Sequence, residues 1–537
     1  MVLLPTAGLL ARVQWPRESP RRLTAVVSLA CGVAALAVAA SHTGGATASV
    51  PPATLVQLTR QPAGAEQKLL AAAGARLVAP ELRLWRIPAG RAPGAVAVLR
   101  ASRVLAFAQK EREYAVMATS DFSDPLVAGE WWRAVVGVSD LTPPGPGVPV
   151  ALVDSGVSFG HPEFVGRPDL VALNPQEPAP IGGVHGTAVA SVVGAPVNGV
   201  GLVGIYPQAV LRSYDAAIGD GTRLASSEIV SGILAAARAG KSVINLSLGA
   251  DSKDAAIERA VGEAVRRGSL VVAASGNSGD AGNPLTYPAA LPHVLTVAAT
   301  DTAGRVAFFS SRSSYVDLAA PGVDIPVASA LDDGYTVESG TSFAAPIVSG
   351  AAAWLWTVRP ELDAGQVAEI LRRSARDVEP AGVDQATGHG MLDLPAALSY
   401  PTPAIDPGEP NDDVGQARNR ALLLTTKART SVGTTGRVTT YEDPRDVLHV
   451  WLPAGKTFSV VATSSVPAGL TVALFRDSAP TVAGQAAPGD RVTLATGGGT
   501  RSTLSFRNAK SGRWAFLVVA PAKGARDVDY TLRATVR

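Results

Sequence analysis

Three segments of the sequence carry side chains that could act together in nucleophilic catalysis. The apolar run Val150–Val153 ends in Asp-Ser-Gly at Asp154, His185 opens the sequence His-Gly-Thr, and Ser342 lies in Gly-Thr-Ser-Phe-Ala. A serine hydroxyl is a weak nucleophile, so it needs a base such as imidazole, which can later act as the acid. A carboxylate behind the imidazole fixes its tautomer and stabilises its protonated form. These residue types therefore predict acyl transfer by a catalytic triad.

The order of the three residues separates the classes of serine hydrolase. Asp154 comes first, His185 second and Ser342 third, whereas α/β-hydrolases run Ser, Asp, His around Gly-x-Ser-x-Gly. Ala344 breaks that motif at its last position. Each segment alone has a structural alternative, because Asp-Ser-Gly is a common turn and Gly-Thr-Ser can simply cap a helix. The three segments together, in this order, favour catalysis.

A fourth segment offers a group that could stabilise negative charge. The apolar run Val271–Ala274 leads into Ser-Gly-Asn at Asn277. The Asn277 amide and the backbone N–H of Ser342 would form an oxyanion hole, at the start of a helix expected over Ser342–Leu355. The alternative for Asn277 is an ordinary turn at a strand end.

With these motifs, residues 124–398 resemble the subtilase family of serine proteases. The resemblance implies that Asp154, His185 and Ser342 are catalytic and that Asn277 is the oxyanion residue. Ala188 departs from the many members that have a second histidine after His-Gly-Thr. That position is not catalytic, so the expected activity is unchanged.

The resemblance also implies where a substrate binds. Ser247, Leu248 and Gly249 are similar to the family segment along which an extended substrate adds as a strand. Their alternative is a plain core strand and turn. Residues Ala273 to Gly276, among them the expected contact residues Ala274 and Gly276, would form one wall of the pocket for the residue before the scissile bond. Because these residues are small, we expect a roomy, neutral pocket that accepts a bulky apolar side chain.

Structural calcium is a further implication of the resemblance. Glu163 stands where the family has an aspartate ligand, Asn198 lies in a glycine-rich loop, and Asp124 is a third candidate. Their oxygen atoms are the ligands that calcium prefers, although exposed acids are more often simply solvated. No cofactor is expected for the chemistry itself.

The elements around the motifs predict an α/β domain over residues 121–400, with a parallel β-sheet flanked by helices. The expected strands are Val150–Val153, Val243–Leu246, Leu270–Ala274 and Val294–Ala298, and the expected helices include Ser226–Ala239 and Asp254–Arg267. Functional groups of such sheets gather at the carboxyl ends of the strands, where Asp154 lies.

A small α+β unit is expected before this domain, over residues 49–120. Helices are expected at Glu66–Ala75 and Ala92–Ala101, and strands at Arg83–Pro88 and Val104–Lys110. The unit resembles a subtilase propeptide, which implies an intramolecular folding template and inhibitor. Self-cleavage would then release it at a junction between residues 115 and 124. A permanent regulatory domain is the alternative.

An all-β sandwich is expected after it. Residues 401–411 form a proline-rich, acidic linker, and residues 412–537 contain short strands separated by Gly, Pro and Asp turns. Asp406–Asp412 resembles the opening of bacterial pre-peptidase C-terminal domains. Such β-sandwiches accompany secreted proteases and can be removed by cleavage.

Residues 1–48 indicate an export signal. Four arginines between positions 12 and 22 precede the apolar run Leu23–Ala40, which small-residue sites follow. We expect a cleaved signal peptide, or alternatively an uncleaved anchor, so that the protein is secreted or tethered facing outside. Cys31 is the only cysteine, which excludes an intramolecular disulfide and leaves lipidation open.

The amino-acid composition of the chain limits the classes of function that remain. Lys and Arg number 47 against 45 Asp and Glu, so the net charge of +2 gives no reason to expect nucleic acid. Two hypotheses remain: a self-processing secreted serine endopeptidase from a GC-rich bacterium, and a catalytically silent secreted binding scaffold. A silent scaffold would normally have lost a triad residue or the oxyanion donor, and the sequence retains all four.

Overall fold

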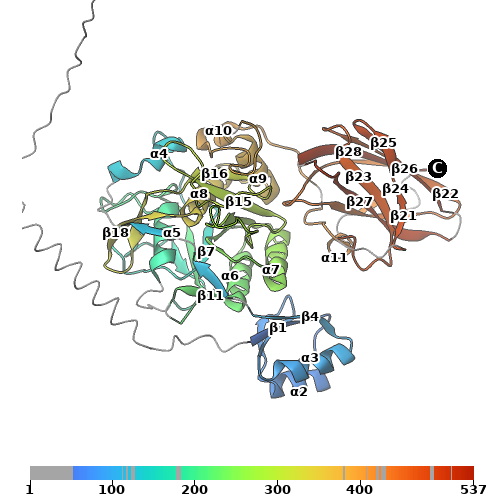
Figure 1. The fold of residues 1–537 in the computed structure, drawn as a ribbon, viewed down its shortest axis with the longest axis horizontal. Helices are drawn as coiled ribbons and strands as arrows, with labels where there is room; N and C mark the ends of the chain where they lie inside the picture. The colour runs from blue at the N-terminus through green and yellow to red at the C-terminus, as the bar shows by residue number, and fades with distance from the viewer. Residues whose placement is uncertain are drawn as a thin grey trace, which may run out of the picture. The chain divides into compact units, whose positions relative to one another are not determined.

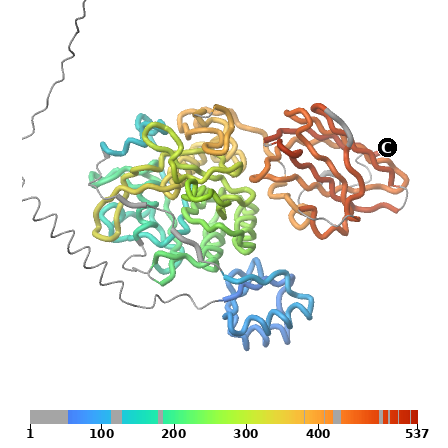
Figure 2. Tube along the Cα trace, viewed as in Figure 1, coloured from blue at the N-terminus to red at the C-terminus, as the bar shows by residue number. Residues whose placement is uncertain are grey.

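The computed structural model describes residues 53–111, 113–116, 119–121, 127–176, 183–219, 221–378, 381–406, 408–418, 422–424, 431–483, 489–508, 511–525 and 527–537. The expected export signal and Asp124 lie outside these residues. Along the chain the structure contains an α+β unit, an α/β domain and a β-sandwich, as Figure 1 and the trace in Figure 2 show. The expected fold class is therefore confirmed.

The α/β domain is built on a sheet of seven parallel strands in the order β16-β15-β14-β12-β7-β9-β8. The strands are β7 (Val150–Asp154), β8 (Leu170–Ala172), β9 (Leu211–Asp215), β12 (Val243–Leu246), β14 (Leu270–Ala274), β15 (Val294–Thr300) and β16 (Leu318–Pro321). Every residue of β7, β12, β14 and β15 is buried, which explains why these strands read as continuous apolar runs.

Helices cover both faces of this sheet. They are α5 (Gly183–Gly194), α6 (Ser226–Arg238), α7 (Ala255–Arg266), α8 (Thr341–Val358) and α9 (Ala364–Arg373). Leu152 of β7 packs in a core that includes residues of α5, α8 and α9, whereas its neighbour Ala151 packs in a core that includes α6 and α7. Among the described helices, α8 is long and apolar enough to cross a membrane, but 89% of its apolar window is buried inside the protein.

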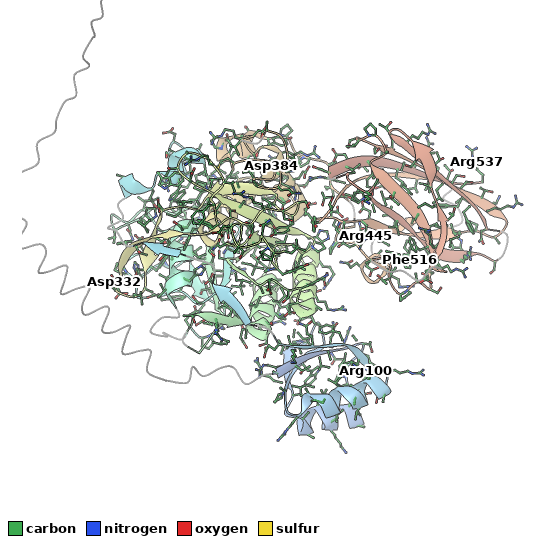
Figure 3. The ribbon with its side chains drawn as sticks, in the orientation of Figure 1. Arg100, Asp332, Asp384, Arg445, Phe516 and Arg537 are labelled. Carbon is green, nitrogen blue, oxygen red and sulfur yellow. The ribbon has the colours of Figure 1, made fainter. Side chains whose placement is uncertain are left out.

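The N-terminal α+β unit has an antiparallel sheet in the order β2-β3-β1-β4 and two helices. Its elements are β1 (Ala53–Leu58), α2 (Ala65–Ala72), β2 (Arg76–Ala79), β3 (Leu84–Pro88), α3 (Ala92–Ala101) and β4 (Leu105–Lys110). It has its own core, which includes Val56, Leu70 and Leu99. Arg100 projects from α3 away from this core (Figure 3).

The β-sandwich has two five-stranded sheets, β19-β21-β27-β23-β24 and β20-β28-β22-β26-β25. Their strands are β19 (Leu422–Leu424), β20 (Ser431–Thr439), β21 (Asp446–Leu452), β22 (Lys456–Ser464), β23 (Leu470–Arg476), β24 (Arg491–Leu494), β25 (Thr496–Gly498), β26 (Arg501–Asn508), β27 (Arg513–Pro521) and β28 (Asp527–Val536). Phe516, labelled in Figure 3, is fully buried in its core. The short helix α11 (Val414–Ala417), capped by Asp413, was not expected.

Residues of the expected linker also contact the sandwich. Asn411 donates a side-chain hydrogen bond to Asp446 at 2.8 Å and accepts one from the backbone N–H of Val447 at 2.7 Å. The carboxylate of Asp406 accepts a hydrogen bond of 2.5 Å from the backbone N–H of Arg437. The segment is therefore tied to the sandwich by its polar side chains.

Candidate active site

Asp154 and His185 form a buried pair at the carboxyl end of the sheet. Asp154 is the last residue of β7, and His185 lies near the start of α5. Nδ1 of His185 lies 2.8 Å from Oδ1 of Asp154, and the two residues are 8% and 1% exposed. The backbone N–H of Ser155 donates to the same oxygen at 2.7 Å. This contact holds the imidazole so that Nε2, which has no hydrogen-bonding partner among the described residues, can receive a proton.

Ser342 lies in the first turn of α8 and is fully buried. The ring of its neighbour Phe343 packs on the His185 ring, with 5.8 Å between centroids and 53° between planes. The Ser342 hydroxyl donates to the Ser247 carbonyl at 3.3 Å in this structure. Hydrogen bonds between a catalytic serine and its base are often formed only when substrate is bound. The structure thus packs the residue after the predicted nucleophile against the predicted base.

Asn277 is oriented by Thr341, the residue before Ser342. The carbonyl oxygen of the Asn277 side chain accepts from the Thr341 backbone N–H at 3.0 Å and from the Thr341 hydroxyl at 2.8 Å. Since two donors hold this oxygen, the hydrogen-bond pattern assigns the NH₂ group to the opposite side of the amide. Thr341 therefore positions the Asn277 amide, a role that its place in the Gly-Thr-Ser motif does not reveal.

A buried polar chain fixes the backbone of Ser342 from the other side. The Ser247 hydroxyl donates to the Ser342 carbonyl at 2.8 Å, and the Asn245 side chain donates to the Ser247 hydroxyl at 3.0 Å. The Ser349 hydroxyl donates to Asn245 at 2.9 Å, so the chain returns to α8. All four residues are at most 1% exposed. Buried polar groups that are all paired in this way make a rigid support. Nothing in the sequence links the side chains of Asn245 and Ser349 to the backbone of Ser342.

The predicted substrate edge is occupied by the chain itself. β5 (Glu113–Val116) pairs antiparallel with β13 (Leu248–Gly249) on one side and with β11 (Arg223–Ala225) on the other. In this register Val116 lies opposite Leu248, and Ala115 lies opposite Gly249 and Arg223. The strand that follows the α+β unit therefore lies where an added substrate strand was expected.

The wall expected from Ala273 to Gly276 begins in the last two residues of β14, which ends at Ala274. Gly276 has φ +109°, and a Cβ atom there would lie 2.4 Å from the Thr286 hydroxyl oxygen and 2.8 Å from that of Ser311. A larger residue would therefore be strained and would clash, so glycine is required at this position.

Two of the residues expected to bind calcium in the α/β domain, Glu163 and Asn198, accept hydrogen bonds from backbone N–H groups of the same loop. Glu163 is 1% exposed, and its Oε1 accepts from the Leu202 N–H at 2.6 Å. Burial raises the pKa of Glu163 to about 7. Asn198 is exposed, and its Oδ1 accepts from the Val200 N–H at 2.8 Å. With Asp124 outside the described residues, calcium at these positions stays a prediction.

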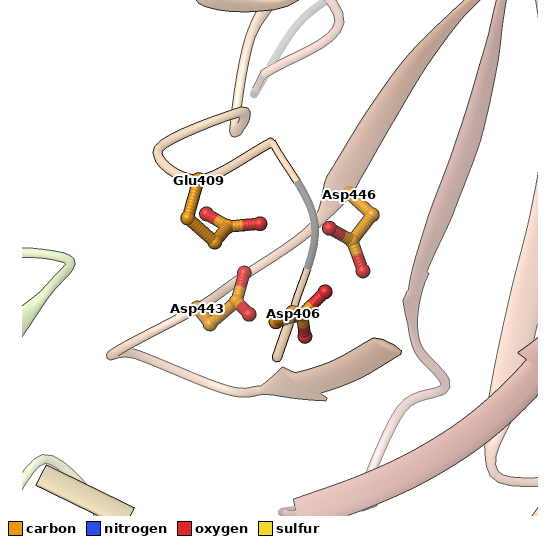
Figure 4. A group of neighbouring side chains, drawn as sticks. All are labelled: Asp406, Glu409, Asp443 and Asp446. Carbon is orange, nitrogen blue, oxygen red and sulfur yellow. The ribbon is translucent and has the colours of Figure 1, made fainter. Parts of the chain in front are cut away.

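A different acidic cluster can hold a cation. The carboxylates of Asp406, Glu409, Asp443 and Asp446 point toward one another, with ligand oxygens within 4.8 Å of each other (Figure 4). Asp443 is 7% exposed, and its Oδ1 has no hydrogen-bonding partner among the described residues. Burial and the neighbouring carboxylates raise the pKa of Asp406 to about 9 and raise those of Glu409 and Asp443. Carboxylates held this closely are stable when some of them are protonated or when a cation lies between them, and their oxygens suit calcium.

Comparison with known proteins identifies relatives for the middle of the chain. The subtilase (peptidase S8) family model matches residues 145–390. Subtilisin BL from Lederbergia lenta is 37% identical over 253 residues, which cover 47% of this chain and 91% of that protein. Subtilisin from Bacillus pumilus is 36% identical over 259 residues, which cover 47% of this chain and 91% of that protein. Subtilisin E from Bacillus subtilis (strain 168) is 35% identical over 286 residues, which cover 50% and 73%.

A structural match covers more of the chain than the sequence matches do. The crystal structure of fervidolysin from Fervidobacterium pennivorans, a keratinolytic enzyme related to subtilisin, superposes with a TM-score of 0.59. The two chains share 22% identity, and the match covers 84% of this chain and 69% of that one. This likeness supports the architecture, and the sequence identity to the subtilisins supports the family. The chain belongs to the subtilase family of serine endopeptidases.

Proposed function

We propose that this protein hydrolyses peptide bonds through an acyl-enzyme, with Ser342 as nucleophile, His185 as general base and Asp154 as the carboxylate that orients it. The observation that carries the proposal is the 2.8 Å contact between His185 Nδ1 and Asp154 Oδ1, which leaves Nε2 open beside the first turn of α8. Asn277 and the Ser342 N–H are the proposed oxyanion donors.

In the proposed mechanism Ser342 Oγ attacks the substrate carbonyl while its proton passes to His185 Nε2. Asp154 stabilises the resulting imidazolium. The negative charge on the tetrahedral oxygen is stabilised by the Asn277 NH₂ group and by the Ser342 N–H, which lies at the positive end of the α8 helix dipole. His185 then protonates the leaving amine, and a water molecule activated by the same imidazole hydrolyses the acyl-enzyme.

A fluorophosphonate probe tests this function directly. We expect the matured protein to be labelled at Ser342 and to hydrolyse an added peptide, because the probe reacts only with an activated serine. Absence of labelling after the N-terminal unit has been removed would instead support a silent binding scaffold. Labelling without hydrolysis of added peptide would restrict the activity to self-processing.

We further propose that the protein is made as a proenzyme whose N-terminal α+β unit is an intramolecular inhibitor. The support is the position of β5 between β13 and β11, on the substrate edge. The described part of this strand ends at Val116, opposite Leu248. The proposed cut follows this strand, between residues 115 and 124, where the sequence predicts the junction.

Sequencing the mature N-terminus checks this assignment. We expect the mature chain to begin between residues 116 and 124. A mature N-terminus outside this segment would contradict the assignment.

We infer that the acidic cluster binds a structural calcium ion through Asp406, Glu409, Asp443 and Asp446. Isothermal titration of the full Ser342→Ala chain with calcium chloride should show binding, and Asp443→Asn should weaken it by about tenfold or more, since one ligand charge is lost. Asp477→Asn is the control, because this carboxylate of the same sandwich pairs with Arg418 at 2.9 Å and lies outside the cluster. Equal calcium affinities of the two variants would contradict this assignment.

We also propose that the protease is exported and acts outside the cell, either released or tethered by residues 1–48. The arginine-rich start and the apolar run that follows it support this location. Polypeptides are the proposed substrates, and the first of them is the chain's own N-terminal unit.

A further inference from the structure

We propose that the β-sandwich is an integral stabiliser of the α/β domain, attached through a charged junction on α9, and that the cation cluster governs this junction. The junction loop, Tyr441–Asp446, carries both the contacts to the α/β domain and two of the cluster's carboxylates. The part of the proposal that concerns the cation rests on the calcium site proposed above, whereas the part that concerns the junction does not.

Arg372, at the end of α9, is the centre of the junction. It is 3% exposed, and its Nη1 lies 2.8 Å from Oε2 of Glu442, which comes from the sandwich. Within its own domain Arg372 also contacts Glu369 at 3.1 Å and Asp317 at 3.4 Å. The contact between the Arg372 guanidinium and the Glu442 carboxylate is an ion pair whose side chains are 3% and 17% exposed. Removal of the carboxylate would leave a buried guanidinium with one partner fewer.

The two residues at the start of the loop add apolar and backbone contacts. Tyr441 packs edge-to-face on Tyr315, with 6.2 Å between centroids and 75° between planes. The Glu442 carbonyl accepts from the His293 backbone N–H at 2.6 Å, and His293 Nε2 lies 2.7 Å from Oδ2 of Asp412. The loop is thus held by an aromatic ring, a backbone hydrogen bond and charges at once.

A second set of charges extends the junction along α9. Arg373 pairs with Asp529 of β28 at 2.8 Å, and Arg437 of β20 pairs with both Glu369 and Asp527. Charges of opposite sign alternate across the contact, so the surface of α9 matches the sandwich specifically. The partner that this face of α9 fits is therefore the chain's own C-terminal domain.

The cation cluster lies directly behind the junction loop. Asp443 follows Glu442 in the sequence, and Asp446 is three residues further on. The carboxylate of Asp443 is buried, and its Oδ1 lacks a partner among the described residues. Without a cation the four carboxylates must either take up protons or repel one another. A bound cation would remove this cost and, in this proposal, fix Glu442 opposite Arg372. A ligand that binds only the folded state stabilises whatever unfolds with its site.

Hydrogen exchange of the full Ser342→Ala chain, which cannot digest itself, tests both parts. In the presence of a chelator, Glu442→Gln and Tyr441→Ala should each speed hydrogen exchange by about tenfold in peptides covering residues 289–296 and 364–376. These segments lose contacts with the sandwich in both variants. Glu361→Gln is the control, since its side chain is 63% exposed near the start of α9 and should change nothing. Unchanged exchange in both test variants would show that the junction does not support the α/β domain.

Calcium then separates the two proposals. Added calcium should slow exchange in the same two segments of the parent chain, and this slowing should disappear in Asp443→Asn and in Glu442→Gln. Protection confined to the sandwich would overturn the coupling while leaving the calcium site intact. Failure of calcium to bind would overturn the calcium site and the cation's control of the loop, and the junction would still be judged by the two variants in chelator.

Discussion

Replacing Ser342 by alanine is expected to lower kcat by about 10⁶-fold, the size of loss seen when the nucleophile of a subtilisin is removed. The reason is that alanine has no hydroxyl to form the acyl-enzyme, while Asn277 and the Ser342 N–H can still bind the carbonyl oxygen. The measurement is hydrolysis of a chromogenic peptide by variant protein whose N-terminal unit has been removed with a second protease.

The same substitution should also stop maturation, since we propose that the cut is made by this active site. Purified Ser342→Ala protein should keep its N-terminal unit, as intact mass would show. Ser399→Ala is the matched control, because this serine is exposed at the end of α10 (Leu394–Ser399) and should mature and hydrolyse normally. Normal maturation of a purified Ser342→Ala chain would mean that another protease makes the cut.

Replacing Asp154 by asparagine is expected to lower kcat by about 10⁴-fold with the fold intact. His185 Nδ1 lies 2.8 Å from Asp154 Oδ1, and this contact fixes the tautomer that leaves Nε2 free to accept a proton. An asparagine NH₂ at that place donates instead of accepting, so it favours the wrong tautomer and does not stabilise the imidazolium. Steady-state kinetics of the matured variant measure the loss.

A neighbouring carboxylate provides the control for Asp154. Asp215 is the register partner of Asp154 on β9, and its Oδ1 accepts from the Ala217 N–H at 2.9 Å. We expect Asp215→Asn to retain activity within about tenfold. The substitution affects local backbone support and leaves the carboxylate partner of the imidazole in place. Similar losses in the two variants would argue that Asp154 acts by general electrostatics and not through His185.

The sequence alone was enough to predict the architecture of the α/β domain. Strands such as Val243–Leu246 and Leu270–Ala274 occur with the predicted bounds, because strands buried on both faces must be apolar throughout. Helix α7 starts one residue after the expected Asp254, since Asp254 is its N-cap and accepts from the N–H groups of Ala256 and Ile257. Burial and helix capping depend on residues that are close in the sequence, so both can be predicted from the sequence.

The candidate catalytic residues could also be named in advance, because their chemistry demands rare residue types in fixed local settings. Asp154, His185 and Ser342 are each recognisable from the few residues around them, and Asn277 from the strand before it. The residues that support them were not recognisable: Thr341, Asn245 and Ser349 are ordinary polar residues in the sequence. Their roles appear only in the hydrogen bonds to Asn277 and Ser247.

Only the tertiary structure decided how the segments before and after the α/β domain contact it. The pairing of β5 with β13 joins residues more than a hundred positions apart, and Glu442 reaches Arg372 across 70 positions. The cation cluster joins two carboxylates before β20 to two just before and at the start of β21. An isolated acid in a linker resembles any solvated acid, and it becomes a ligand or an ion-pair partner only when folding brings the other groups to it. The sequence by itself therefore determined the family, the fold class and the candidate triad, whereas long-range packing determined what surrounds and stabilises them.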